Sequence, residues 1–138
     1  GEGRHMKFLD GYTEHSYALL RIVAGLLFTA HGVQKLFNFP VAFEYPLNPV
    51  LYAAAAIELI GGALIVLGLF TRPAAFIASG MSAVGYWMAH GSAGLFPIVN
   101  GGETIALYCF IFLFIAACAG MTDRQKWPFR SKPAFTGL

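Results

Sequence analysis

Four long apolar stretches divide the chain, and residues that interrupt helices separate them. Prolines follow the first stretch, Thr71-Arg72-Pro73 separates the second from the third, and Pro97 to Gly102 precede the fourth, as is typical of chain reversals. Each stretch is long enough to cross a hydrocarbon core of about 30 Å. Because lipid admits no open sheet edge, the pattern predicts an all-α fold, a four-helix transmembrane bundle. The expected spans are residues 17–36, 51–70, 74–90 and 103–121.

Composition supports a membrane protein and excludes one class of partner. The chain of 138 residues is 57% hydrophobic and 12% charged, with a mean hydropathy of +0.63, whereas about a quarter of a soluble domain is charged. A net charge of +2 is too small to indicate a nucleic-acid partner, so we expect the lipid bilayer as the surroundings. Residues 1–5 resemble a cloning remnant, and residues 6–138 are expected to form one domain.

Basic residues predict the orientation of the spans. Lys35 lies near one side, and six other basic residues lie on the opposite side: Lys7, Arg72, Arg124, Lys126, Arg130 and Lys132. The positive-inside rule then places both termini in the cytoplasm. The tail after Met121 is expected to lie against an anionic leaflet, and the connection from residue 37 to 50 could cover the outer half of the bundle.

Two of the expected spans carry polar stripes about 80° wide on a helical projection. In lipid such faces turn inward. One stripe holds Arg21, Phe28, His31 and Lys35, and the other holds Ser79, Ser82, Tyr86 and His90.

The second span contributes one charge, Glu58, flanked by small residues that either let a neighbouring helix approach or leave room for a ligand. At about 1.5 Å per residue, His31 and Glu58 lie roughly 7 and 10 Å below the outer ends of their spans. Lys35 would lie at the rim above them. His90, Asn100 and Glu103 share that rim, whereas Arg21 falls near the cytoplasmic end.

Each of these polar residues has a structural alternative to a functional role. An unpaired carboxylate near mid-membrane costs about 2.5 to 3.5 kcal/mol, so Glu58 should pair with Lys35 or a protonated His, or carry a proton. Arg21 and Lys35 could instead snorkel to the interfaces. Tyr86, with Trp87, fits an interfacial aromatic belt. His31 and His90 could each bond between helices or contact a ligand. Cys109 and Cys118 fall on opposite faces of one span and cannot bond to each other.

At these positions the sequence resembles the DoxX family of small bacterial membrane proteins. The resemblance rests on Leu20-Arg21 with His31-Gly32-Val33-Gln34-Lys35-Leu36, on Glu58-Leu59-Ile60-Gly61-Gly62 with Gly68-Leu69-Phe70-Thr71-Arg72, and on Met88-Ala89-His90 before Asn100-Gly101-Gly102-Glu103. It implies a four-helix membrane protein akin to DoxD-type subunits of quinol oxidase and thiosulfate:quinone oxidoreductase. A shared fold does not fix the chemistry.

The residues and the resemblance together suggest a quinone-linked membrane oxidoreductase component with an outer-half pocket. Glu58, His31 and Lys35 would be catalytic, and the remaining polar positions would bind the ligand: Arg21, Tyr86, His90, Asn100 and Glu103. No haem, iron-sulfur or dinucleotide motif is present, so electrons would come from a redox partner subunit or the substrate. A non-enzymatic bundle that binds or transports a small molecule, a metal site, a scaffold without ligand, and a homo-oligomer all stay open.

Overall fold

The structure is a computed structural model that describes residues 7 to 119, and within that range it contains helices and no strands. The predicted all-α class is confirmed. The suspected remnant and the basic tail lie outside the described residues. The elements are η1 (Lys7–Tyr12), α1 (Thr13–Phe37), α2 (Pro49–Ala56), η2 (Ile57–Gly61), α3 (Gly62–Leu67), α4 (Thr71–Ala89), η3 (Gly91–Ala93), α5 (Pro97–Asn100) and α6 (Glu103–Ala119).

The elements α2, η2 and α3 follow one another without a break from Pro49 to Leu67. The start is fixed by Asn48, whose Oδ1 accepts a hydrogen bond from the Leu51 backbone N–H at 2.9 Å, and by Pro49, which has no N–H to leave unsatisfied. The end falls three residues before the expected Phe70. Gly68 and Phe70 adopt left-handed φ values of 74° and 47°, which no α-helix can continue.

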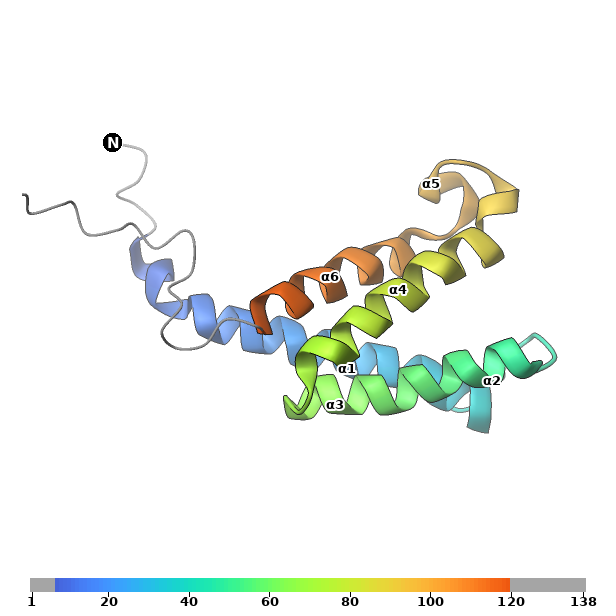
Figure 1. Cartoon of the computed structure of the whole chain (residues 1–138). Helices are drawn as coiled ribbons and strands as arrows, with labels where there is room; N and C mark the ends of the chain where they lie inside the picture. Colours follow the sequence, from blue (N-terminus) through green and yellow to red (C-terminus); the bar gives the residue numbers. More distant parts are fainter. Residues whose placement is uncertain (1–6, 120–138) are drawn as a thin grey trace, which may run out of the picture.

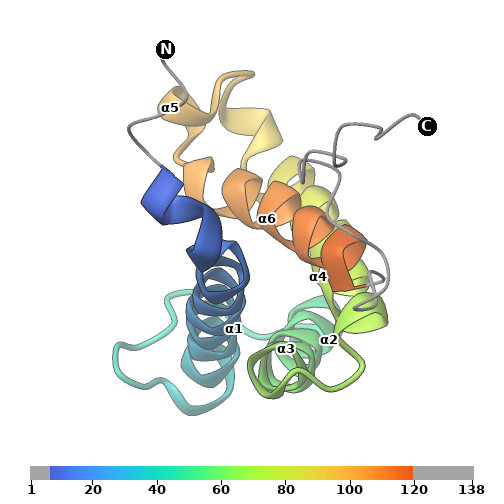
Figure 2. The same ribbon diagram turned by 90° about the vertical axis from the view of Figure 1, so that its left-hand side faces the viewer.

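The helices pack as two antiparallel pairs (Figures 1 and 2). The first pair is α1 with the continuous α2–η2–α3 segment, and the second is α4 with α6. The pairs lie closest near the α3–α4 turn, and Figure 1 shows them diverging towards the opposite end. The aromatic core joins them where they are close: the ring centroids of Phe28 and Phe112 are 4.7 Å apart, and both side chains are fully buried with Ile65 and Ile115.

Glycines bring the two helices of the first pair almost into backbone contact. A Cβ atom added at Gly32 would lie 3.0 Å from the Ala55 carbonyl oxygen, and one at Gly25 would lie 3.0 Å from the Gly62 carbonyl oxygen. Larger residues would force the helices apart. Of the two roles expected for the small residues around Glu58, close helix approach is therefore the one observed at Ala55 and Gly62.

Two helical segments of the described chain are long and apolar enough to cross a membrane, Phe8–Phe37 and Pro49–Leu67. The apolar helix α6 is shorter, with 17 residues. The count of four spans therefore stays a prediction, although four long helical segments match the predicted stretches to within a few residues.

Candidate functional site

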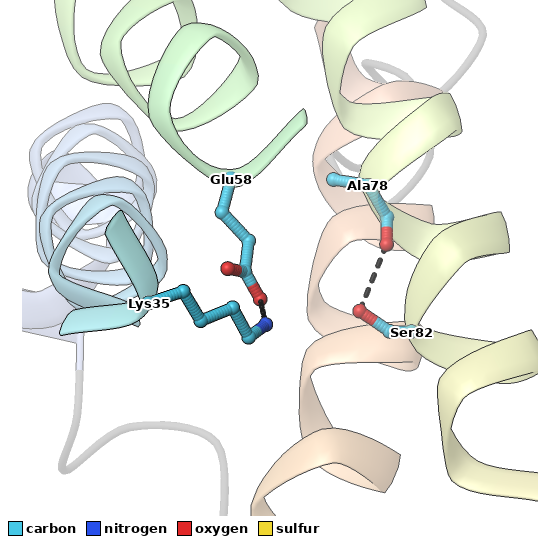
Figure 3. A network of polar contacts seen from close by, with 4 residues as sticks. All are labelled: Lys35, Glu58, Ala78 and Ser82. Atoms are coloured by element: carbon cyan, nitrogen blue, oxygen red, sulfur yellow. Dashed lines mark hydrogen bonds and ion pairs between the residues drawn. The ribbon is translucent and has the colours of Figure 1, made fainter. Parts of the chain in front are cut away.

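A buried ion pair links the two helices of the first pair. Lys35 Nζ, in the last turn of α1, donates a hydrogen bond to Glu58 Oε1 at 2.5 Å. In Figure 3 the two side chains point towards one another, and Ser82 of α4 lies across from them. Glu58 is 5% exposed, and the Lys35 side chain 15%. The predicted pairing is thus confirmed, and snorkelling of Lys35 to the interface is wrong.

Local geometry explains how the pair forms. Glu58 lies in η2, a single π-helical turn inside an otherwise regular segment. Such π-bulges change the direction of side chains and occur often at functional sites. On the facing helix, Gly32 allows the close approach described above, and Lys35 follows it by three residues on the same helix. The bulge and the glycine therefore place the ammonium beside the carboxylate.

One half of the carboxylate is not used. Among the residues that the structure describes, Glu58 Oε2 is buried and has no hydrogen-bond partner. Leaving a buried acceptor unpaired costs about 1 to 3 kcal/mol, and more when the group is charged. The Lys35 ammonium has three N–H donors, and the one bond described for it goes to Glu58 Oε1. The pair therefore keeps an unused acceptor on Glu58 and unused donors on Lys35.

Aromatic side chains of α1 and α6 lie beside this pair. The ring of His31, which is exposed, meets Tyr108 edge-on with centroids 5.9 Å apart. Tyr108 stacks on Phe112 at 5.6 Å and lies within electrostatic reach of Glu58. The described residues give its hydroxyl no hydrogen-bond partner. Sequence reasoning missed Tyr108 because α6 is apolar on every side; the only signal was a hydroxyl-bearing ring within that apolar run.

A second polar network holds the connection between α4 and α6. Asn100 Nδ2 donates to Tyr86 Oη at 2.9 Å and to the Gly94 carbonyl at 3.0 Å, while Asn100 Oδ1 accepts from the Gly102 N–H at 2.8 Å. His90 Nδ1 lies 3.0 Å from the Asn100 carbonyl oxygen. These side chains bind one another and the loop backbone, and in this way they support the turn.

The remaining predicted ligand-binding residues are not gathered at the pair. Tyr86 is 8% exposed and belongs to the network above, whereas Trp87 is 61% exposed. Their place in an interfacial aromatic belt stays a prediction. Glu103 is exposed at the start of α6. Arg21 lies at the opposite end, where Nη1 donates to the carbonyls of Ile65 at 2.6 Å and Val66 at 3.1 Å, so it caps α3. Its contact with cytoplasmic headgroups stays a prediction.

Within residues 7 to 119 no three His, Cys, Asp or Glu side chains come close enough to hold a metal ion. The metal site that the sequence left open would use His31, Glu58, His90 and Glu103, whose side chains suit zinc, iron or manganese. These four residues are not assembled into one site. Cys109 and Cys118 are free thiols, as their spacing predicted.

The fold and the buried pair define a small helical membrane protein. The DoxX family profile matches residues 16–91, which cover α1 from Ser16 onward, the whole α2–η2–α3 segment, α4 and both members of the ion pair. A Haemophilus influenzae protein named "Uncharacterized protein" is 40% identical over 126 residues, covering 83% of this chain and 94% of that relative. The chain belongs to the DoxX family.

A second relative carries a functional name. The Bacillus subtilis protein named "Putative oxidoreductase CatD" is 39% identical over 60 residues, which are 39% of this chain and 44% of that protein. No solved structure matches the chain. The similarity to this second relative is local, and its name describes that relative.

Proposed function

We propose that the protein is a four-span component of a quinone-linked membrane oxidoreductase, with the Lys35–Glu58 pair as the binding site for the quinone headgroup. The single observation that carries the proposal is the buried, unpartnered Oε2 of Glu58 beside a lysine with N–H groups to spare. Ionisable side chains within membrane spans are costly and are retained mainly where they serve binding or proton transfer. The name of the Bacillus subtilis relative supports the reaction class.

The residues fit a quinone headgroup chemically. A quinone accepts electrons and protons in equal numbers and so couples electron transfer to proton uptake. The Lys35 ammonium would donate a hydrogen bond to a headgroup oxygen, and Glu58 would hand on the protons that accompany the electrons. His31, the third predicted catalytic residue, stands against Tyr108 near the pair and can supply a further hydrogen bond. Electrons would enter from a redox partner subunit.

The same proposal includes an orientation. All four long helices would cross a bacterial inner membrane, with both termini and the α3–α4 turn in the cytoplasm. The described structure is compatible with this placement, since one cavity is lined by residues from the start of α1, the α3–α4 turn and the end of α6: Tyr17, Gly68, Thr71 and Ala119. The Lys35–Glu58 pair would then lie in the outer half of the membrane.

The test is a comparison of Glu58→Gln with Glu103→Gln, which removes an exposed carboxylate from α6. Both proteins are purified with their membrane partners. Quinones in the organic extract are quantified by mass spectrometry, and quinone reduction is assayed with the partner present. We expect Glu58→Gln to lose about 10²- to 10⁴-fold in turnover, the contribution typical of general acid–base catalysis. Glu103→Gln should behave as the native protein.

Other outcomes separate the alternatives. Bound quinone without turnover in either the native protein or the variant would favour non-enzymatic binding or transport. An extract without quinone, together with full turnover of Glu58→Gln, would remove the pair from the reaction.

A further inference from the structure

Two cavities lie at the end of the fold that carries the α3–α4 turn, far along α1 from Lys35. The first, of about 400 Å³, is lined by Arg21 and Arg72 together with Tyr17, Gly68, Phe70, Thr71, Pro73 and Ala119. Its volume is in the range of small-molecule sites. Among the described residues its lining includes two guanidinium groups and no carboxylate, so it is suited to an anion.

Arg21, which lines this cavity, still has unused N–H donors. Its Nη1 is held by the carbonyl oxygens of Ile65 and Val66, which fixes the position of the guanidinium. Arginine has five N–H donors, and the Nη2 and Nε groups make no hydrogen bond to the residues that the structure describes. A guanidinium that is anchored on one edge and free on another can bind a phosphate with little further loss of side-chain entropy.

The start of α4 adds positive potential to the same cavity. The N-cap residue Phe70 gives no side-chain hydrogen bond, and the first turn of this 19-residue helix has no acidic residue. The backbone N–H groups of Thr71 and Arg72 therefore lack partners within the helix. Together with the Arg72 side chain, which is exposed, they favour an anion here.

The second cavity makes the site amphipathic. It has a volume of about 420 Å³ and shares Arg72 and Pro73 with the first, but the rest of its lining is apolar: Phe76, Leu113, Ala116 and Ala117. It therefore runs from the arginines along the surface where α4 packs against α6. Small alanine side chains leave this groove open between larger apolar ones.

We propose that these two cavities form one binding site for an anionic phospholipid. The phosphate is bound by Arg72, by the free edge of Arg21 and by the N–H groups that begin α4, and an acyl chain lies in the groove between α4 and α6. Basic pockets between membrane helices bind anionic headgroups in this way. The site is separate from the Lys35–Glu58 pair and does not depend on the proposed reaction.

The test measures lipid binding to the delipidated full-length protein in detergent by native mass spectrometry. Phosphatidylglycerol and phosphatidylcholine with identical acyl chains are compared, and inorganic phosphate is the third probe. We expect phosphatidylglycerol to bind more tightly than phosphatidylcholine. Arg72→Gln should weaken the affinity for phosphatidylglycerol about fivefold, because one basic residue near a headgroup contributes about 1 kcal/mol. Arg72→Lys, which keeps the charge, should lose less of this affinity.

A matched pair of variants tests the groove. Ala117→Leu fills the groove and should weaken the binding of phosphatidylglycerol. Ala63→Leu, the control, makes the same change at an exposed alanine of α3 outside both cavities. Lys7→Gln controls for the loss of one charge elsewhere. Equal binding of the two lipids, unchanged affinity in Arg72→Gln, or displacement of the lipid by equimolar inorganic phosphate would each overturn the proposal.

Discussion

The Lys35–Glu58 pair and the network around Asn100 are both buried polar groups in an apolar bundle, but they use their hydrogen-bonding capacity differently. The Asn100 amide makes three hydrogen bonds, two of them to the backbone of its own loop. The Glu58 carboxylate accepts one hydrogen bond, from Lys35 on another helix, and its Oε2 has no partner among the described residues.

This difference separates structural from functional polar groups better than residue type does. A network whose members satisfy one another stabilises a loop and has nothing left for a ligand. A charged pair with spare capacity costs stability, so its presence calls for a binding partner or a proton-transfer role. By the criterion of unused hydrogen-bonding capacity, we keep Lys35 and Glu58 as candidate site residues and interpret Tyr86, His90 and Asn100 as structural.

The largest effect that would sharpen the comparison is expected from Lys35→Met. Removing the ammonium leaves the Glu58 carboxylate buried with no partner, and the expected loss of unfolding free energy is about 3 to 5 kcal/mol. Chemical unfolding in detergent measures it.

The double variant Lys35→Met, Glu58→Gln removes both charges and should recover most of that loss. If the single variant is as stable as the native protein, the pair is not buried in the membrane-embedded protein. The comparison with the Asn100 network then fails.

A smaller effect is expected from Asn100→Ala. The substitution leaves the Gly102 N–H and the Gly94 carbonyl without their partner, which should cost about 1 to 3 kcal/mol. Because Asn100 serves only the turn in our interpretation, the amount of quinone retained after purification should equal that of the native protein. Mass spectrometry of the extract, normalised to folded protein, checks this, and a selective loss of quinone would return Asn100 to the ligand site.

Much of the fold follows from the apolar pattern. Helix bounds agree with the predicted stretches because Pro49 and Asn48 start one segment and left-handed Gly68 ends it, and these residues have local conformational preferences. The extra turn of α1 before Tyr17 was not expected, because Thr13 to Ser16 are polar and helix formation there does not depend on burial. The divergence of the two helix pairs depends on tertiary packing that no local pattern contains.

The part of the site that could be predicted is the ion pair, because helical periodicity and charge balance determine which side chains meet. Glu58 needed a cation, and Lys35 was the basic residue nearest the same level, so their pairing followed. The partner of Arg21 was not predictable, because it is a pair of backbone carbonyls at a helix end. Tyr108 was missed for the related reason that α6 has no polar face to mark a side.

The smallest expected effect concerns Gly101, which ends α5 with a left-handed φ of 73° while its N–H donates to the Pro97 carbonyl at 3.0 Å. A Cβ atom there would meet nothing within 4 Å, so the cost of Gly101→Ala is conformational alone, about 1 to 2 kcal/mol. Gly101→Asn should cost less, since Asn tolerates this conformation. Thermal unfolding in detergent ranks the two variants, and both should keep native quinone retention because the turn lies in the satisfied network. Loss of quinone from Gly101→Ala but not from Gly101→Asn would mean that the shape of this turn closes the site, and the two polar regions would then have to be treated as one.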